Sequence, residues 1–345
     1  AMPNTDPPVD CAAVAGEVLS LGSSALCRVA VAGAITVGRA GECLAPMGEL
    51  AALGVRVFTD DGAGVQDAGV MRRALEYARG LGVTLAQHCE LSSLAGGGLM
   101  HEGAWSSRLG VPGVPAEAEE LMVARDIALV RLTGARVHLL HLSSAGSASL
   151  VAQAKAEGLA VTAEVTPHHL TLTDAELESY DPLYKVNPPL RGTADVSALR
   201  AGCAAGTIDA VASDHAPHPP ESKETTLEAA APGMLGLETA LAVTMDALTD
   251  GTGMSAGEVL ALMSWRPARL AGMAAQDGGD QGGPVGPGSP ANLCVFDPAA
   301  QWEVDSAKLA SRSRNTPWAG RTLRGRVRHT IYRGEPVVID GVPQR

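Results

Sequence analysis

The sequence predicts an α/β fold, a (β/α)₈ barrel of the TIM type with a small accessory β domain. Three observations support this prediction. Apolar, strand-like runs alternate with helical segments, and each helical segment ends near a glycine. Acidic and histidine side chains also gather at the C-terminal ends of several runs. Polar residues at many strand ends are typical of a barrel, whereas a doubly wound sheet gathers its ligand mainly at one switch point.

Six apolar runs are predicted to be buried strands. They span residues 25–38, 54–62, 82–90, 135–144, 159–170 and 207–218. The segments 70–82, 117–134 and 147–158 between them repeat apolar residues at helical spacing. A barrel closes with eight strands, so we expect these runs to be strands 3 to 8. On this interpretation residue 1 lies just beyond the second strand, and the first two strands are largely missing from this chain.

The remaining segments complete the predicted organisation. A helix is expected over 10–22, and two helices over 235–272. Residues 276–290 are rich in glycine and proline and predict a linker. Short alternating runs with glycine turns follow it. We therefore expect a barrel over 1–275, incomplete at its N-terminus, and a small β domain over 291–345.

Composition limits the partners of this chain. The net charge is −12, which argues against nucleic acid and against anionic membranes. No apolar stretch reaches 18 residues without a charge or a breaker, so no membrane span is expected. The six cysteines form no CxxC pair, which favours a reduced, cytoplasmic location.

The strand ends carry residue types that bind metals. They are Asp60, Asp61, His88, His141, His168, His169, Asp214 and His218. Zinc takes nitrogen and oxygen ligands and keeps an open position for water in catalytic sites. Two such ions can share a bridging oxygen and make hydroxide available at neutral pH. Hydrolysis is therefore the predicted reaction.

Each of these residues also has a structural interpretation. "FTDDG" is a common turn signal, and His88 or His141 alone could be a core histidine. His138 points away from the face of His141 and is expected to be structural, and so is His215. His168 and His169 could simply end a strand. Asp214 is harder to explain structurally, because a buried carboxylate without a partner is costly.

Several motifs together resemble one family. In chain order they are "MPNT", "FTDDG", "QHCE", "HLLHLSSAGS", "EVTPHHLTLTD", "YKVNPPLR", "ASDHAPH", "GMLGLETAL" and "SPANLCVFDP". This pattern covers nearly the whole chain and resembles the bacterial dihydroorotases, class I type, of the amidohydrolase superfamily.

The resemblance implies a role for each motif residue. Asp61 would bridge two zinc ions, and His88 and His141 would bind the second of them. Asp214 would bind the first ion and act as the general acid/base. The implied substrate contacts are Asn4, Asn187, His218 and the backbone of Pro232 and Gly233.

The implied reaction is the reversible interconversion of (S)-dihydroorotate plus water with N-carbamoyl-L-aspartate, in pyrimidine biosynthesis. A zinc-activated hydroxide would attack the cyclic amide, with one or two zinc ions in each subunit. The resemblance leaves open a homodimer and an association with aspartate transcarbamoylase.

One departure from the family is serious. Dihydroorotases carry an HxHxR motif on the first strand, and this sequence contains no HxH. "QHCE" is also followed by Leu91 where an acid is usual. Two explanations remain, a fragment of a longer protein or a non-catalytic scaffold for aspartate transcarbamoylase. The retained ligands favour the fragment, which we expect to be weakly active or inactive.

A second enzyme class also remains open. Allantoinase and dihydropyrimidinase are related cyclic-amide hydrolases. They normally carry a lysine on the strand where this chain has Asp60 and Asp61. The two acids therefore favour dihydroorotase.

Overall fold

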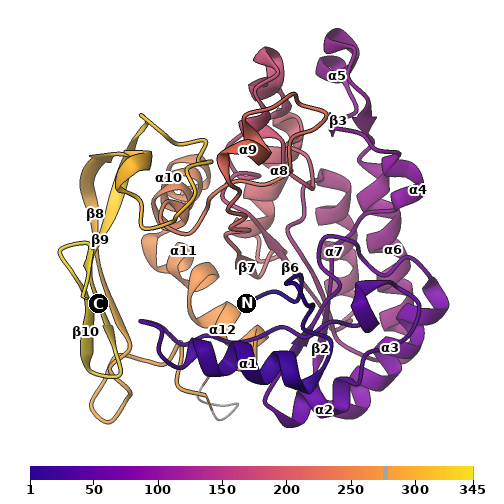
Figure 1. Ribbon diagram of the computed structural model, residues 1–345, viewed down its shortest axis with the longest axis horizontal. Helices are drawn as coiled ribbons and strands as arrows, with labels where there is room; N and C mark the ends of the chain where they lie inside the picture. Colours follow the sequence, from indigo (N-terminus) through magenta and orange to yellow (C-terminus); the bar gives the residue numbers. More distant parts are fainter. Residues whose placement is uncertain (275–278, 345) are drawn as a thin grey trace.

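A five-stranded parallel sheet organises the computed structural model, which describes residues 1–274 and 279–344 (Figure 1). Its strands pair in sequence order, β1-β2-β5-β6-β7. They are β1 (Val57–Phe58), β2 (Thr84–Gln87), β5 (Val137–Leu139), β6 (Val161–Val165) and β7 (Ala210–Val211). Every pairing is parallel, so the carboxyl ends of all five strands lie at one edge.

A helix follows each of the first four strands, directly or after a short excursion. They are α3 (Ala68–Leu81), α6 (Glu117–Thr133), α7 (Ala145–Ala156) and α8 (Thr193–Ala204). Neighbouring helices in this series contact one another in the same order as the strands do. Helix α3 shows why the sequence folds this way. Asp67 caps its first turn by accepting from the Val70 amide, Gly82 ends it at φ 71°, and its buried face enters the main core.

The predicted strand over 25–38 is wrong as a continuous strand. Only Gly33 pairs with Phe58, through a single parallel bridge, and Thr36 bridges Leu44. The Ile35 and Thr36 amides donate to the Asp60 carboxylate instead of to a neighbouring strand. Pairing therefore stops after one bridge, because the backbone donors are used by a side chain.

Between β2 and α6 the chain forms a small excursion that the sequence did not predict. It contains α4 (Ser92–Ala95), the parallel pair β3 (Met100–His101) and β4 (Gly113–Val114), and α5 (Ala104–Leu109). Two 3₁₀ helices, Asp174–Ser179 and Pro182–Tyr184, lie between β6 and α8, and α5 and β3 pack against the first of them. These segments lie beyond the edge of the sheet that carries the carboxyl ends of the strands (Figure 1).

Further helices lie before and after the parallel strands. The predicted N-terminal helix is confirmed as α1 (Ala12–Gly22), and a 3₁₀ turn (Val37–Arg39) and α2 (Met47–Ala52) follow it. After β7 come α9 (Pro220–Lys223), α10 (Ala240–Thr252), α11 (Ala256–Met263) and α12 (Trp265–Leu270). The region 235–272 thus holds three helices and not two. Ser264, at φ −129° and ψ −91°, breaks the helical path between α11 and α12.

An antiparallel sheet occupies the C-terminal part of the chain, beside α10 to α12 (Figure 1). Its order is β11-β10-β9-β8. The strands are β8 (Leu293–Glu303), β9 (Thr322–Tyr332), β10 (Glu335–Ile339) and β11 (Val342–Pro343), with a 3₁₀ turn at Ser306–Lys308. Arg324 of β9 pairs with Asp246 and Asp250 of α10 at 3.1 and 2.8 Å.

The predicted linker is only partly observed. Residues 276–278 lie outside the described residues, and 279–290 contain no helix or strand beyond one bridge from Gln281 to Ala274. The division into domains at 275 and 291 stays a prediction. Across the described chain, no helix combines the length and apolar character needed to cross a membrane.

Candidate metal centre

Three side chains converge at the carboxyl edge of the parallel sheet. Asp61 lies in the loop after β1, His88 directly follows β2, and His141 follows β5. The His88 Nδ1 and His141 Nε2 atoms are 3.0 Å apart. The Asp61 Oδ1 atom lies 3.3 Å from His141 Nε2 and 3.7 Å from His88 Nδ1. One ligand atom from each residue lies within 4.8 Å of the others, so these residues could hold a metal ion.

The electrostatics of this cluster suit a cation. Burial disfavours charge on His141, but the Asp61 hydrogen bond and the Asp214 carboxylate raise the pKa of His141 to about 9. Burial and the neighbouring His141 lower the pKa of His88 to about 4. The neighbouring carboxylates therefore favour a positive charge at His141, and a metal ion could supply that charge in place of the proton. Two nitrogens and an oxygen are a donor set that zinc accepts, so the residues present fit this ion.

His141 of the cluster and Asp214 both have a strained backbone conformation. His141 has φ 32° and Asp214 has φ 43°, both in the left-handed region. A non-glycine residue held in such a conformation costs about 1–3 kcal/mol and persists only where the surroundings enforce it. Strain of this kind gathers at functional sites. Both residues lie just beyond a strand end, where the chain turns its side chain toward the cluster.

Two buried charged residues that sequence reasoning missed, Glu119 and Arg191, hold the turn that follows His141 through Ser143 and Ser144. The Glu119 carboxylate accepts from the Ser143 and Ser144 amides and from the Ser143 hydroxyl. Arg191 donates from Nε to the same hydroxyl at 3.0 Å. Glu119 and Arg191 are each 2 % exposed. Arg191 ends the motif "YKVNPPLR". Its place directly after two prolines and a leucine was the only feature of the sequence that could have indicated a buried charge.

The two acids of "FTDDG" have separate tasks. Asp61 faces the cluster, whereas Asp60 is fully buried and binds the Ile35 and Thr36 amides and the Thr36 hydroxyl. Asp60 is thus a structural residue. It fixes the segment that precedes the 3₁₀ turn Val37–Arg39 against β1. The sequence alone could not tell these neighbours apart.

This separation predicts opposite outcomes at the two positions. Asp60→Ala leaves buried donors without an acceptor, so it lowers the free energy of unfolding by about 3 kcal/mol. Asp61→Ala removes its hydrogen bond with the His141 side chain but no bond to buried backbone, so it should lower that free energy by only about 1 kcal/mol. Urea unfolding of the two metal-free variants checks the difference. Equal losses of stability would contradict the assignment.

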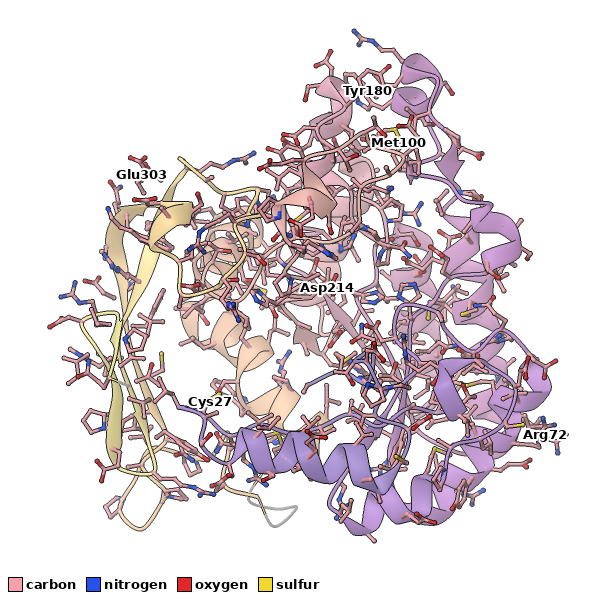
Figure 2. The ribbon with its side chains drawn as sticks, viewed as in Figure 1. Cys27, Arg72, Met100, Tyr180, Asp214 and Glu303 are labelled. Carbon is pink, nitrogen blue, oxygen red and sulfur yellow. The ribbon has the colours of Figure 1, made fainter. Side chains whose placement is uncertain are left out.

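Asp214 lies near the centre of the view in Figure 2, just beyond the carboxyl end of β7, and is partly exposed. Burial raises the pKa of Asp214 to about 6; His141 opposes the increase, and Asp61 and Glu164 add to it. Within the described residues, Asp214 is not part of the three-residue group that lies within 4.8 Å. Asp214 nevertheless follows β7 at the same edge of the sheet as that group, and its charge interacts with His141 and Asp61.

The predicted substrate residues lie in three places. Asn187 Nδ2 is 3.5 Å from His88 Nε2, and Asn187 lines a cavity of about 140 Å³ with Glu90, Lys185 and Pro232. His218 pairs its Nε2 with the Pro232 carbonyl oxygen at 2.9 Å. Asn4 is exposed, and no hydrogen bond joins its side chain to another described residue.

The other histidines have mainly structural contacts. His138 contacts Thr162 and Glu164 at 2.9 and 3.0 Å, as its structural interpretation predicts. His169 contacts the Thr166 hydroxyl and the Pro188 carbonyl oxygen. His215 accepts from the Gly236 and Leu237 amides. His168 is buried, and among the described residues its Nε2 has no hydrogen-bond partner.

A cluster that could hold a metal ion lies at the carboxyl edge of a parallel α/β sheet, an arrangement typical of metal-dependent hydrolases. Solved structures share its fold. The L-hydantoinase (dihydropyrimidinase) of Arthrobacter aurescens superposes with a TM-score of 0.82 at 24% identity, covering 100% of this chain and 77% of that one. The dihydropyrimidinase of Brevibacillus agri gives 0.82 at 21% identity, covering 99% and 77%.

Sequence comparison narrows the class. The chain is 50% identical over 344 residues to a dihydroorotase of Streptomyces coelicolor, covering 99% of this chain and 79% of that protein. It is 47% identical over 348 residues to a dihydroorotase of Anaeromyxobacter dehalogenans, covering 100% and 78%. A family model described as Dihydro-orotase-like matches residues 1–147. The chain belongs to the dihydroorotase family, whose members are metal-dependent cyclic amidohydrolases.

Proposed function

We propose that this chain interconverts (S)-dihydroorotate plus water with N-carbamoyl-L-aspartate, in pyrimidine biosynthesis. The observation that carries this proposal is the Asp61, His88 and His141 cluster in a chain half identical to a dihydroorotase. The cluster argues against the scaffold alternative. Burying two imidazoles beside a carboxylate is costly, and a chain that binds no metal gains nothing from it.

We infer that zinc is the metal and that Asp61, His88 and His141 hold it. Asp61 and Asp214 would be ligands of a second ion. When bound, zinc supplies a water whose pKa is lowered toward ~7 and an electrophile that polarises the substrate carbonyl. The three residues that would hold this cation follow β1, β2 and β5.

Asp214 is the proposed general acid/base. A carboxyl with a pKa of about 6 can both hold and release a proton near neutral pH. In hydrolysis its carboxylate takes a proton from the attacking water and delivers that proton to the amide nitrogen as the ring C–N bond breaks. In ring closure the same carboxylate removes the proton from the attacking nitrogen and delivers it to the oxygen that departs as water when the ring C–N bond forms. The position of Asp214 beside the cluster supports this role.

Asn187 and His218 are the proposed side-chain contacts to the substrate, with Asn4 and the backbone of Pro232 and Gly233. An amide and an imidazole can donate hydrogen bonds to a ring carbonyl or a carboxylate without a cluster of basic residues. The approach of Asn187 to His88 supports a place for it next to the reacting carbonyl. The cavity that Asn187 and Pro232 line supports a place for the ring.

We further propose that the parallel sheet is part of a (β/α)₈ barrel. The sequential strand order and the matching series of helix contacts support it. A cytoplasmic location, a homodimer and an association with aspartate transcarbamoylase stay predictions.

The substrate assignment has a direct test. The full chain is loaded with zinc, and its turnover of dihydroorotate, allantoin and dihydrouracil is compared. We expect dihydroorotate to be preferred, however slow the turnover is. Preference for allantoin or dihydrouracil would overturn the assignment in favour of another cyclic-amide hydrolase.

A further inference from the structure

Two buried lysines lie together beside the substrate cavity. The sequence contains only four lysines against 22 arginines. Lys185 and Lys223 are 8 % and 7 % exposed, and neither forms an ion pair within the described residues. A buried ammonium group without a carboxylate is costly unless other acceptors surround it. The acceptors here are backbone carbonyl groups.

Lys223 donates to three carbonyl oxygens. Its Nζ lies 3.3 Å from Lys185 O, 2.9 Å from Ala231 O and 3.1 Å from Gly233 O. Lys185 in turn donates to Leu227 O at 2.8 Å and Glu228 O at 3.1 Å. An ammonium group has three donors in a compact arrangement, whereas the planar guanidinium of arginine does not reproduce it. The two lysines thus tie down the carbonyl groups of the segment that follows α9.

Asn315 reaches the same segment from the C-terminal part of the chain. Its Nδ2 donates to Ala216 O at 2.9 Å and to Gly233 O at 3.2 Å, and its Oδ1 accepts from the His218 amide at 3.3 Å. Its own carbonyl oxygen accepts from the Leu235 amide at 3.0 Å. Asn315 is 6 % exposed. It therefore joins the two ends of residues 216–235, which we call the cover loop.

These contacts meet at Gly233. Its carbonyl oxygen accepts from both Lys223 and Asn315, and its amide donates to Lys185 O at 2.9 Å. Its φ is 132°, and a Cβ there would lie 2.5 Å from the Ala216 Cβ. A loop in this conformation is unfavourable by itself and needs external contacts to hold it.

We propose that Lys223 and Asn315 are positioning residues that clamp the Gly233 carbonyl from two sides and hold the cover loop against the substrate cavity. The clamp fixes the Pro232–Gly233 backbone and, through the contact of His218 with Pro232, the His218 imidazole. This inference rests on the proposed function only in taking Pro232, Gly233 and His218 as substrate contacts.

The test uses Lys223→Met and Asn315→Asp in the zinc-loaded full chain. Methionine keeps the length of the lysine side chain and removes its donors. Aspartate keeps the acceptor for the His218 amide and places a carboxylate oxygen against two carbonyls. Lys308→Met is the control, because the Lys308 side chain is 84 % exposed.

Two measurements are expected to change together. Hydrogen exchange followed by mass spectrometry should show about tenfold faster exchange confined to the cover loop. The KM for dihydroorotate should rise at least about fivefold while kcat changes less than about threefold, because binding and not the chemical step is affected. Lys308→Met should change neither.

The outcomes separate the clamp from the proposed function. Unchanged cover-loop exchange in both variants would overturn the clamp, as would an equal acceleration over the whole chain. Faster cover-loop exchange with an unchanged KM would overturn the positioning role. If the unsubstituted chain prefers allantoin or dihydrouracil to dihydroorotate, the proposed function fails, and faster exchange confined to the cover loop still supports the clamp.

Discussion

Asp214→Asn is expected to lower the turnover of dihydroorotate by about 10³-fold, within the range of 10² to 10⁴ that general acid/base catalysis contributes. Asparagine keeps the shape of the side chain but cannot exchange the proton between water and the amide nitrogen. Because Asp61, His88 and His141 are untouched, the variant should keep the zinc ion that these three residues are proposed to hold. Steady-state kinetics and zinc content, measured on one preparation, check both statements.

The same strand offers a matched control for this variant. Asp209 lies at the amino end of β7, where it pairs with Lys155 at 2.6 Å, and Asp214 lies beyond the carboxyl end. Asp209→Asn removes the same charge from the opposite edge of the sheet. It should leave turnover within about threefold of the unsubstituted chain. Unchanged turnover in Asp214→Asn would rule out the acid/base role.

His141→Asn is expected to raise the dissociation constant for zinc by at least about 100-fold. Even outer residues of a metal site change affinity by about 10–100-fold, and His141 supplies a ligand atom itself. The measurement is competition with a chromophoric zinc chelator. Turnover at limiting zinc should fall with the bound metal.

His138→Asn is the control for the zinc measurement. His138 lies in the same strand region three residues earlier and contacts Thr162 and Glu164. This variant removes an imidazole of similar burial but no proposed ligand. Its zinc dissociation constant should stay within about threefold of the original. A similar loss of affinity in both variants would contradict the assignment of His141 to the metal site.

Much of the parallel region could be predicted because it follows local patterns. Apolar runs bounded by glycines predicted all five paired strands, although the strands are shorter than the runs. Asp61, His88 and His141 could be grouped because the carboxyl ends of parallel strands meet at one edge. Their convergence within 4.8 Å follows from that topology.

The failures have a common physical origin in contacts between distant residues. The run 25–38 has the composition of a strand, but Asp60 takes the amides that a strand would use. Asn315 contacts Ala216 across 99 positions of sequence, a pairing that no local pattern encodes. Glu119 and Arg191 are buried charges, which a hydrophobicity pattern assigns to the surface.

The most direct test of the metal centre is the X-ray absorption spectrum of the zinc-loaded chain. The account predicts nitrogen and oxygen scatterers at ~2.0–2.2 Å, with the outer-shell pattern of two imidazoles from His88 and His141. The chain contains six free cysteines that could compete for zinc. Sulfur scatterers at ~2.3 Å, or a spectrum without imidazole, would contradict the site at Asp61, His88 and His141.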